Sequence, residues 1–173
     1  MPSARRVSQR RVVVRRLDTR CQGGYRQHDD QPALISSYAA ASDALPCEWR
    51  LECGGRVRQH MAFDYAQLLG MATVDHRLGL GIALTDLLAH VGLETGAEVL
   101  VAHESTGRTF GVPIREVIAD DNARLTLGTS RRPLRPGTGF PVRFDVPGWT
   151  DPSKPVVVDS LRAVDFSEFV RCP

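Results

Sequence analysis

The clearest helical pattern in the chain lies in residues 81–92, GIALTDLLAHVG. Their apolar side chains recur at the i, i+3, i+4 and i+7 spacing of one helix face. These side chains are Leu84, Leu87, Leu88 and Val91. Gly92 follows directly, and glycine is the residue best suited to end a helix in a left-handed conformation. The stretch therefore predicts a helix over residues 82–91 that packs one face against a core.

Short strand patterns lie on both sides of this helix. Upstream, apolar and polar residues alternate from Trp49, which predicts a strand. Gly54 and Gly55 then predict a turn, and Val57 is expected to begin a second strand. Asp64 is placed to cap a short helix, and a strand pattern begins at residue 73. Downstream, strands are expected at residues 98–103, 109–110, 125–127, 141–146 and 155–164, and a short helix after residue 113. Together these elements predict an α+β fold with a mixed β-sheet and short helices.

Length and composition fit one globular domain. The chain has 173 residues, of which 42% are hydrophobic and 24% charged. No apolar run approaches the ~18 residues of a membrane span, and none near the start suits a secretory signal. We therefore expect a cytoplasmic protein without membrane contact. The predicted organisation is a disordered arginine-rich tail over 1–45, one domain over 46–166, and a C-terminal tail over 167–173.

The charge is unevenly distributed along the chain. Residues 1–30 contain eight arginines against three aspartates, a local charge of +5 within a total of +2, so the remainder carries about −3. Two interpretations explain these arginines. One is an arm that binds nucleic acid or another anionic partner, and the other is a solvated, disordered tail. We favour the solvated tail and do not expect nucleic-acid binding. The use of arginine in place of lysine indicates a GC-rich, bacterial genome.

Four motifs occur in a recognisable order. They are WRLE at 49–52 with GRV at 55–57, FDY at 63–65, GIALTDLL at 81–88, and GFPVR at 139–143 followed by VPG at 146–148. In this order the chain resembles the oxidoreductase molybdopterin-binding domain of the sulfite oxidase family over residues 49–164. The resemblance implies a sulfite-oxidase-like molybdopterin-binding fold and a relationship to molybdenum oxidoreductases.

One segment departs from that family. In the family a cysteine thiolate ligates molybdenum, within a pattern resembling D-x-H-C that precedes the GIALTDLL-like helix. Here the segment is TVDHRLGLG at 73–81, so Asp75 and His76 are followed by Arg77. Arginine cannot replace a soft thiolate as a metal ligand. We therefore expect a pseudoenzyme, although the resemblance leaves oxidoreductase activity open.

Five residues are the predicted cofactor- or anion-binding positions, and none is assigned to catalysis or to a metal. They are His76, Arg77, Gly139, Pro141 and Arg143. Arg77 and Arg143 have the planar donor geometry that binds oxyanions, but space-filling and a structural salt bridge are the alternatives. A lone histidine at a strand end, such as His76, is more often a surface or hydrogen-bonded residue than a cofactor contact.

Other positions near the motifs have two interpretations. Arg131, Arg132 and Arg135 form a basic loop that either binds an anionic partner or is simply solvated. Trp149 near Lys154 either covers the pocket or is a surface aromatic. Thr138 stands where the family has a histidine, and Lys154 is the single lysine where the family has a K-x-x-K-W run.

Three functions remain open at this point. The first is a non-catalytic binding or interaction module without a cofactor, whose partner is an unknown protein or an anionic small molecule. The second is an oxidoreductase or carrier that still binds molybdopterin. The third is nucleic-acid binding through the arginine-rich tail, which would weaken steeply with salt.

Overall fold

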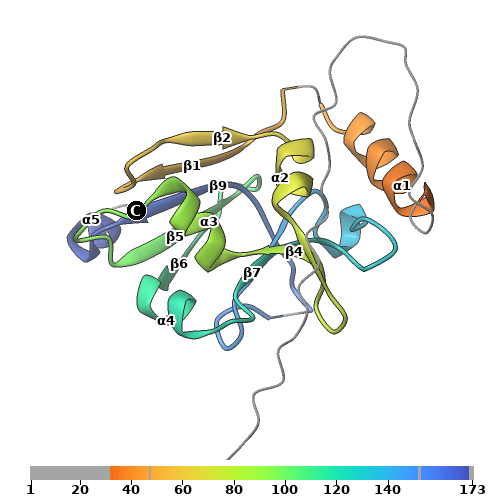
Figure 1. The fold of residues 1–173 in the computed structure, drawn as a ribbon. Helices are drawn as coiled ribbons and strands as arrows, with labels where there is room; N and C mark the ends of the chain where they lie inside the picture. The colour runs from red at the N-terminus through yellow and green to blue at the C-terminus, as the bar shows by residue number, and fades with distance from the viewer. Residues whose placement is uncertain (1–31, 47, 152, 172–173) are drawn as a thin grey trace, which may run out of the picture.

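The computed structural model describes residues 32–46, 48–151 and 153–171 (Figure 1). The elements in chain order are α1 (Pro32–Asp43), β1 (Leu51–Gly55), β2 (Met61–Phe63), α2 (Tyr65–Met71), β3 (Thr73–Asp75), β4 (Gly79–Ala83), α3 (Leu84–Val91), β5 (Val99–Glu104), β6 (Thr109–Pro113), α4 (Ile114–Ala119), β7 (Arg124–Gly128), the short 3-10 helix η1 (Pro136–Thr138), β8 (Arg143–Asp145), β9 (Val156–Val164) and α5 (Phe166–Arg171). The arginine-rich segment 1–31 lies outside the described residues.

The strands form one curled, mixed sheet. Its order is β2-β1-β9-β8-β7-β4-β3, and β5 pairs with both β9 and β6. β9 runs parallel to β1 and antiparallel to β5 and β8, so one strand joins both halves of the sheet. The predicted α+β class with a mixed sheet and short helices is confirmed.

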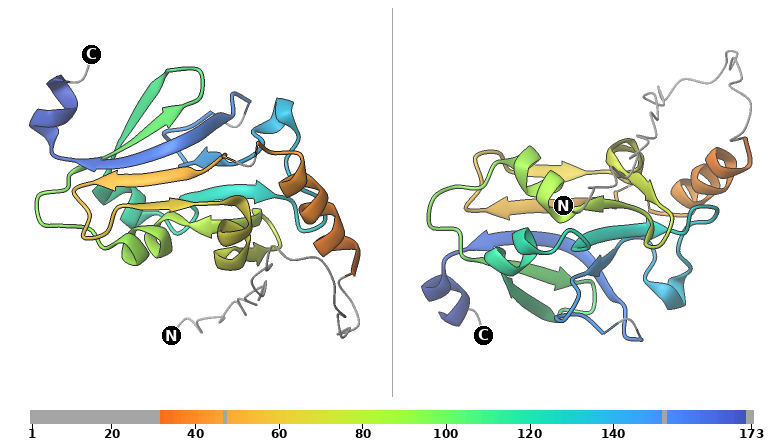
Figure 2. Two further views of the ribbon diagram at one scale, coloured as in Figure 1. Left: turned by 90° about the horizontal axis from the view of Figure 1, so that it is seen from above. Right: turned by 60° about the horizontal axis from the view of Figure 1, so that its bottom comes forward.

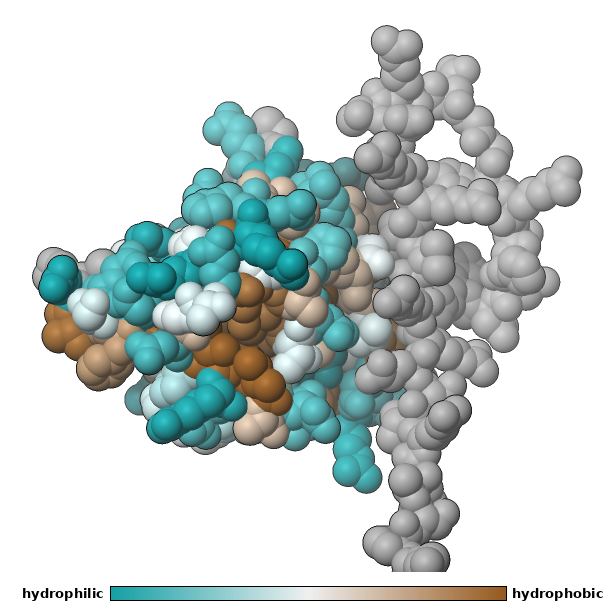
Figure 3. Space-filling model, turned by 60° about the vertical axis from the view of Figure 1, so that its left-hand side comes forward, coloured by the Kyte–Doolittle hydropathy of each residue, from teal (hydrophilic) through white to brown (hydrophobic). Residues whose placement is uncertain are grey.

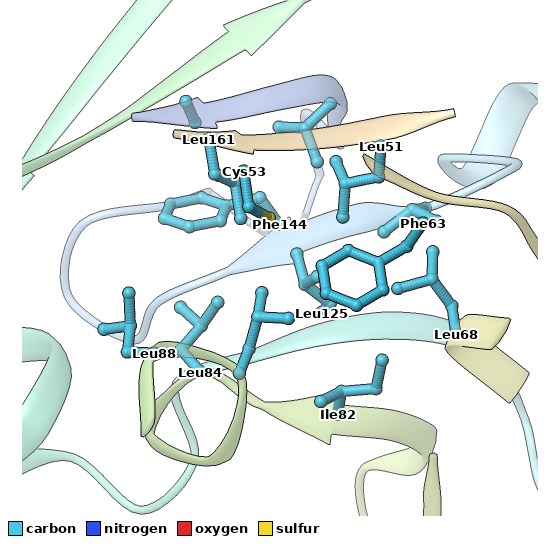
Figure 4. Packing of buried hydrophobic residues seen from close by; sticks show 14 of the residues in the cluster. Leu51, Cys53, Phe63, Leu68, Ile82, Leu84, Leu88, Leu125, Phe144 and Leu161 are labelled. Carbon is cyan, nitrogen blue, oxygen red and sulfur yellow. The ribbon is translucent and has the colours of Figure 1, made fainter. Parts of the chain in front are cut away.

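The core lies inside the curl (Figure 4). Leu51, Cys53 and Leu161 project from β1 and β9 on one side, and Ile82 and Leu84 approach from the opposite side. The side chain of Phe144 lies between these two groups with no exposed surface. α2, α3 and α4 lie on the side of the sheet formed by β4 and β7 (Figures 1 and 2).

Local signals set most of the element ends. Asp64 accepts the backbone N–H of Gln67, and the Gln67 side chain accepts the N–H of Asp64, so a capping box starts α2. Gly92 ends α3 with a φ of 73°, as predicted. The helix begins at Leu84 rather than at residue 82, because residues up to Ala83 pair with β7. The sheet overrides the helix pattern over this first turn.

The second strand of the opening hairpin is displaced from its predicted start. Val57 forms only an isolated bridge with Leu93, and the strand that pairs with β1 begins at Met61. Gly55 has a φ of 82°, and a Cβ there would lie 2.2 Å from the carbonyl oxygen of Ala163. The chain thus turns close against β9 before it returns.

The structure also differs from the predicted domain boundaries. Within the expected tail 1–45, residues 32–43 form α1, and Tyr38 is buried. Within the expected tail 167–173, residues up to Arg171 belong to α5, and Phe169 packs on Val99, Val101 and Val164. Both helices are short, and their sequences carry no clear local pattern. Contacts with the rest of the fold, through Tyr38 and Phe169, therefore account for their order. Apart from these differences, the boundaries stay a prediction.

The outer surface of the molecule is partly apolar at its C-terminal helix. The apolar surface at the left of the space-filling view lies at α5, where Phe166 and Val170 are exposed (Figure 3). None of the helices in the described part of the chain is long and apolar enough to cross a membrane.

Candidate functional site

The predicted residues His76 and Arg77 lie at the tip of the β3–β4 hairpin. β3 and β4 pair antiparallel from Thr73 opposite Gly81 to Asp75 opposite Gly79. A carboxylate oxygen of Asp75 accepts the backbone N–H of Arg77 at 2.7 Å and that of Leu78 at 2.8 Å. These bonds lower the pKa of Asp75, because they stabilise its charged form. The hairpin turn is therefore short and closed, with the His76 and Arg77 side chains exposed.

Gly139, Pro141 and Arg143 form a second group, on the loop that leads into β8. Gly139 has a φ of 105°, and a Cβ at this position would lie 2.8 Å from the Cβ of Arg143. The Phe140–Pro141 peptide bond is cis. Arg143 Nε lies 2.9 Å from the carboxylate of Asp145. The predicted arginine is therefore already paired with a carboxylate of its own strand.

Arg124 connects the two groups, and sequence reasoning missed it. Its side chain is 6% exposed, and its Nη2 donates to the carbonyl oxygen of Gly79 at 3.3 Å. A Cβ at Gly81 would lie 2.9 Å from both Nε and Nη2 and 2.3 Å from the carbonyl oxygen of Leu125, so the guanidinium lies directly over this glycine. The alternation of β7 predicted Leu125 as a core residue, but no sequence signal showed that Arg124 would be buried.

The charge of Arg124 is incompletely compensated. Its buried Nε has no hydrogen-bond partner. Asp75 and Asp145 attract the guanidinium, yet among the described residues no carboxylate lies within salt-bridge distance of it. Burial lowers the pKa of Arg124, with these carboxylates opposing the effect. Since arginine stays protonated in proteins, a buried cation remains at the centre of the site.

Asp145 is the shared hydrogen-bond partner of Arg143 and Thr126, on the side of the sheet that carries Arg124. Besides Arg143, it accepts a hydrogen bond from the Thr126 hydroxyl. Thr126 is buried and lies opposite Arg143 in the β7–β8 register. Arg124, Thr126, Arg143 and Asp145 alternate with core residues and therefore share one face, which we call the polar face.

Among the described residues, no cysteine is placed to ligate molybdenum at this site. The β3–β4 turn contains none. Cys53 is buried beside Leu87, Leu88 and Leu161, and burial raises its pKa to about 12, so the thiol is protonated at neutral pH. Cys21, Cys47 and Cys172 lie outside the described residues. Within the described ranges no three His, Cys, Asp or Glu side chains are grouped to hold a metal.

The basic loop and Trp149, which the sequence also singled out, are exposed to solvent. Arg131, Arg132 and Arg135 lie on the exposed loop between β7 and η1. Trp149 is 43% exposed. A surface hollow of about 330 Å3 over β1, β2 and β9 is lined by Glu52, His60, Ser160 and Arg162 among others, and it contains none of the predicted residues.

Comparison with known proteins identifies the scaffold. A family model described as oxidoreductase molybdopterin binding domain matches residues 79–167, which is just over half of the chain. The crystal structure of the sulfane dehydrogenase SoxCD from Paracoccus pantotrophus is similar, with a TM-score of 0.58 and 20% sequence identity. The similarity covers 68% of this chain and 38% of that one, so the chain spans well under half of that protein. The search of curated proteins gave no match.

Proposed function

The chain belongs to the oxidoreductase molybdopterin binding domain family, and from this premise we propose that it acts as a binding module rather than as a molybdenum enzyme. Its ligand is an anionic group, carried by a small molecule or by a protein partner. One argument carries the proposal: the β3–β4 turn holds Arg77 at the position that the resemblance assigns to the family's metal-ligating cysteine. That turn is closed by the two hydrogen bonds to Asp75.

The polar face supports an anionic ligand. Arg124 is buried without a carboxylate in contact, and Arg77 lies exposed at the adjacent turn. Guanidinium groups bind oxyanions through paired N–H donors. The carboxylates of Asp75 and Asp145 limit the net positive charge, so we expect moderate affinity and strong dependence on salt.

The first test measures the cofactor directly. The full chain is produced in a host that makes the molybdenum cofactor, next to a family member that has the cysteine. Molybdenum is measured by elemental analysis, and pterin by fluorescence after oxidative release. We expect both signals in the relative and neither in this chain. Stoichiometric molybdenum and pterin in this chain would contradict the proposal.

A substitution tests the turn itself. Arg77→Cys places a thiol at the position that the resemblance assigns to the family's cysteine, but the turn remains closed by Asp75. We expect no gain of molybdenum in this variant, and Arg77→Ser serves as the matched control. Loading of Arg77→Cys alone would mean that only the thiolate is missing from an otherwise intact pocket.

A second candidate function is that the chain still binds molybdopterin through other groups. The specific observation in its favour is the buried Arg124, because an anionic ligand would supply its missing counter-charge. Pterin without molybdenum in the first test would favour this candidate. Nucleic-acid binding through the arginine-rich tail 1–45 remains a prediction, and residues 1–31 of that tail lie outside the described residues. Its test is salt-dependent affinity before and after removal of residues 1–45.

A further inference from the structure

Tyr38 joins α1 to a distant loop. Its side chain is 4% exposed. The hydroxyl lies 2.8 Å from the carbonyl oxygen of Thr129 and 2.9 Å from that of Arg132, which follow it by 91 and 94 residues. Figures 1 and 2 both show α1 alongside the loop between β7 and β8. A helix upstream of the family match therefore contacts the basic loop directly.

The loop forms a tight turn around that contact. Thr129 donates its backbone N–H to the Arg132 carbonyl at 2.8 Å, and its hydroxyl accepts the N–H groups of Arg131 and Arg132. Gly128 precedes the turn, and a Cβ there would lie 2.1 Å from the Tyr38 hydroxyl. The phenol thus occupies a space that only glycine leaves open, and Arg131 and Arg132 are held toward solvent.

The same turn supports the β3–β4 hairpin. A Cβ at Gly79 would lie 2.4 Å from the carbonyl oxygen of Gly128 and 3.2 Å from the Cα of Thr129. The two backbones are therefore packed without an intervening side chain. A continuous line of contacts runs from Tyr38 through Gly128 and Thr129 to the hairpin that carries Arg77.

Few of the α1 side chains that the structure describes, those of residues 37–43, are buried. The helix contains 12 residues, PALISSYAAASD, and a helix of that length is marginally stable in isolation. Among its described side chains Tyr38 is the buried one, while Ala41 is only partly buried against the core. Elements with few buried contacts open at a lower free energy than the global unfolding of the domain.

We propose that α1 is a detachable strap that holds the Thr129–Arg132 turn and the β3–β4 hairpin in one geometry. In the docked state Tyr38 fixes the two turns against each other. Release of α1 removes the phenol, frees the carbonyl groups of the turn, and lets both turns move. The strap thereby regulates ligand binding at the polar face, a part of the inference that rests on the proposed function.

Amide hydrogen exchange of the full chain, read by peptide mass spectrometry, tests the strap. The variants are Tyr38→Ala and Tyr38→Phe, and Ala40→Ser on the exposed side of α1 is the matched control. We expect exchange at residues 75–81 and 128–135 to quicken about tenfold in Tyr38→Ala, and about fivefold in Tyr38→Phe, which keeps the ring but loses the hydrogen bond. β5 and β9 should keep the exchange rates of the unaltered chain.

Two results overturn the strap. One is unchanged exchange at both turns in Tyr38→Ala. The other is equal acceleration in β5 and β9, which would make α1 an inseparable part of the core. Because this readout needs no ligand, it is independent of the proposed function.

Titration with inorganic phosphate tests the regulation separately. We expect phosphate affinity of Tyr38→Ala and of the unaltered chain to differ by at least about threefold, since a ligand shifts an equilibrium only by its differential affinity. Equal affinity overturns the regulatory part. Failure of every variant to bind phosphate contradicts the proposed anion site, and hydrogen exchange then still decides whether the strap exists.

Discussion

The two faces of β7 and β8 differ in kind although they share the same backbone. The inner face carries Leu125, Leu127 and Phe144, all without exposed surface. The opposite face carries Arg124 and Thr126, which are buried as well. The inner face is an ordinary apolar core, whereas the polar face buries a cation whose Nε has no partner. Under the proposed function, the inner face supplies most of the stability and the polar face supplies the ligand contacts.

The largest effect is expected on the inner face. Phe144→Ala removes a fully buried ring that packs edge-on against Phe110. We expect a loss of about 3–5 kcal/mol in the free energy of unfolding, because the cavity left behind relaxes only partly. Urea denaturation measures the loss. Phe166→Ala at an exposed site is the control and should change stability by less than about 0.5 kcal/mol. A small loss at Phe144 would contradict this assignment of the inner face.

The next effect concerns the carboxylate of the polar face. Asp145→Asn removes the charge that pairs with Arg143, and it weakens the hydrogen bond from Thr126. We expect a loss of about 1–3 kcal/mol, since Arg143 loses its ion-pair partner and Arg124 keeps only Asp75 of the two carboxylates that attract it. Phosphate affinity should rise in the same variant. A double-mutant cycle with Arg143→Met isolates the pair, and zero coupling between the two sites would show that the pair does not stabilise the fold.

Arg124 should behave in the opposite sense. Arg124→Met replaces a buried cation by an apolar side chain of similar length. We expect stability to be unchanged or to rise by about 1 kcal/mol, because a buried charge without a contacting partner is costly. Phosphate binding should be lost in parallel. If the variant is instead strongly destabilised, Arg124 belongs to the structural part of the molecule and the contrast between the faces fails.

The smallest effect is the pH dependence of the β3–β4 turn. The pKa of Asp75 is lowered in the folded state, so its contribution is present above the ordinary pKa of about 3.9 and disappears as pH falls through the lowered value. Asp75→Asn should flatten the stability curve in that acidic range. Thermal unfolding at closely spaced pH values below about 5 provides the measurement. Identical curves for the two proteins would show that the turn makes no such contribution.

The sequence predicted the elements whose signals are local. The apolar spacing in α3, its end at Gly92 and the capping residue Asp64 were all identified from neighbouring residues alone. The family resemblance, now shown, rested on such segments too.

The features that sequence could not supply depend on distant partners. Tyr38 is buried because Gly128 leaves space for it, and Arg124 is buried because Gly81 does. Neither glycine marks its partner in the sequence. The roles of His76, Arg77, Gly139, Pro141 and Arg143 stay predictions; the structure places them in two groups that Arg124 links.

β9 has a consequence for how the protein is made. This strand pairs with β1 and β5 in one half of the sheet and with β8 in the other, and Glu52 lies opposite Ser160. During synthesis β1 and β5 therefore lack their shared pairing strand, β9, until residue 164 has left the ribosome. Pairing between strands that are distant in sequence slows folding. Until β9 pairs, the exposed edges of β1 and β5 can associate with other chains. Chaperone contact with the nascent chain should consequently persist until β9 emerges.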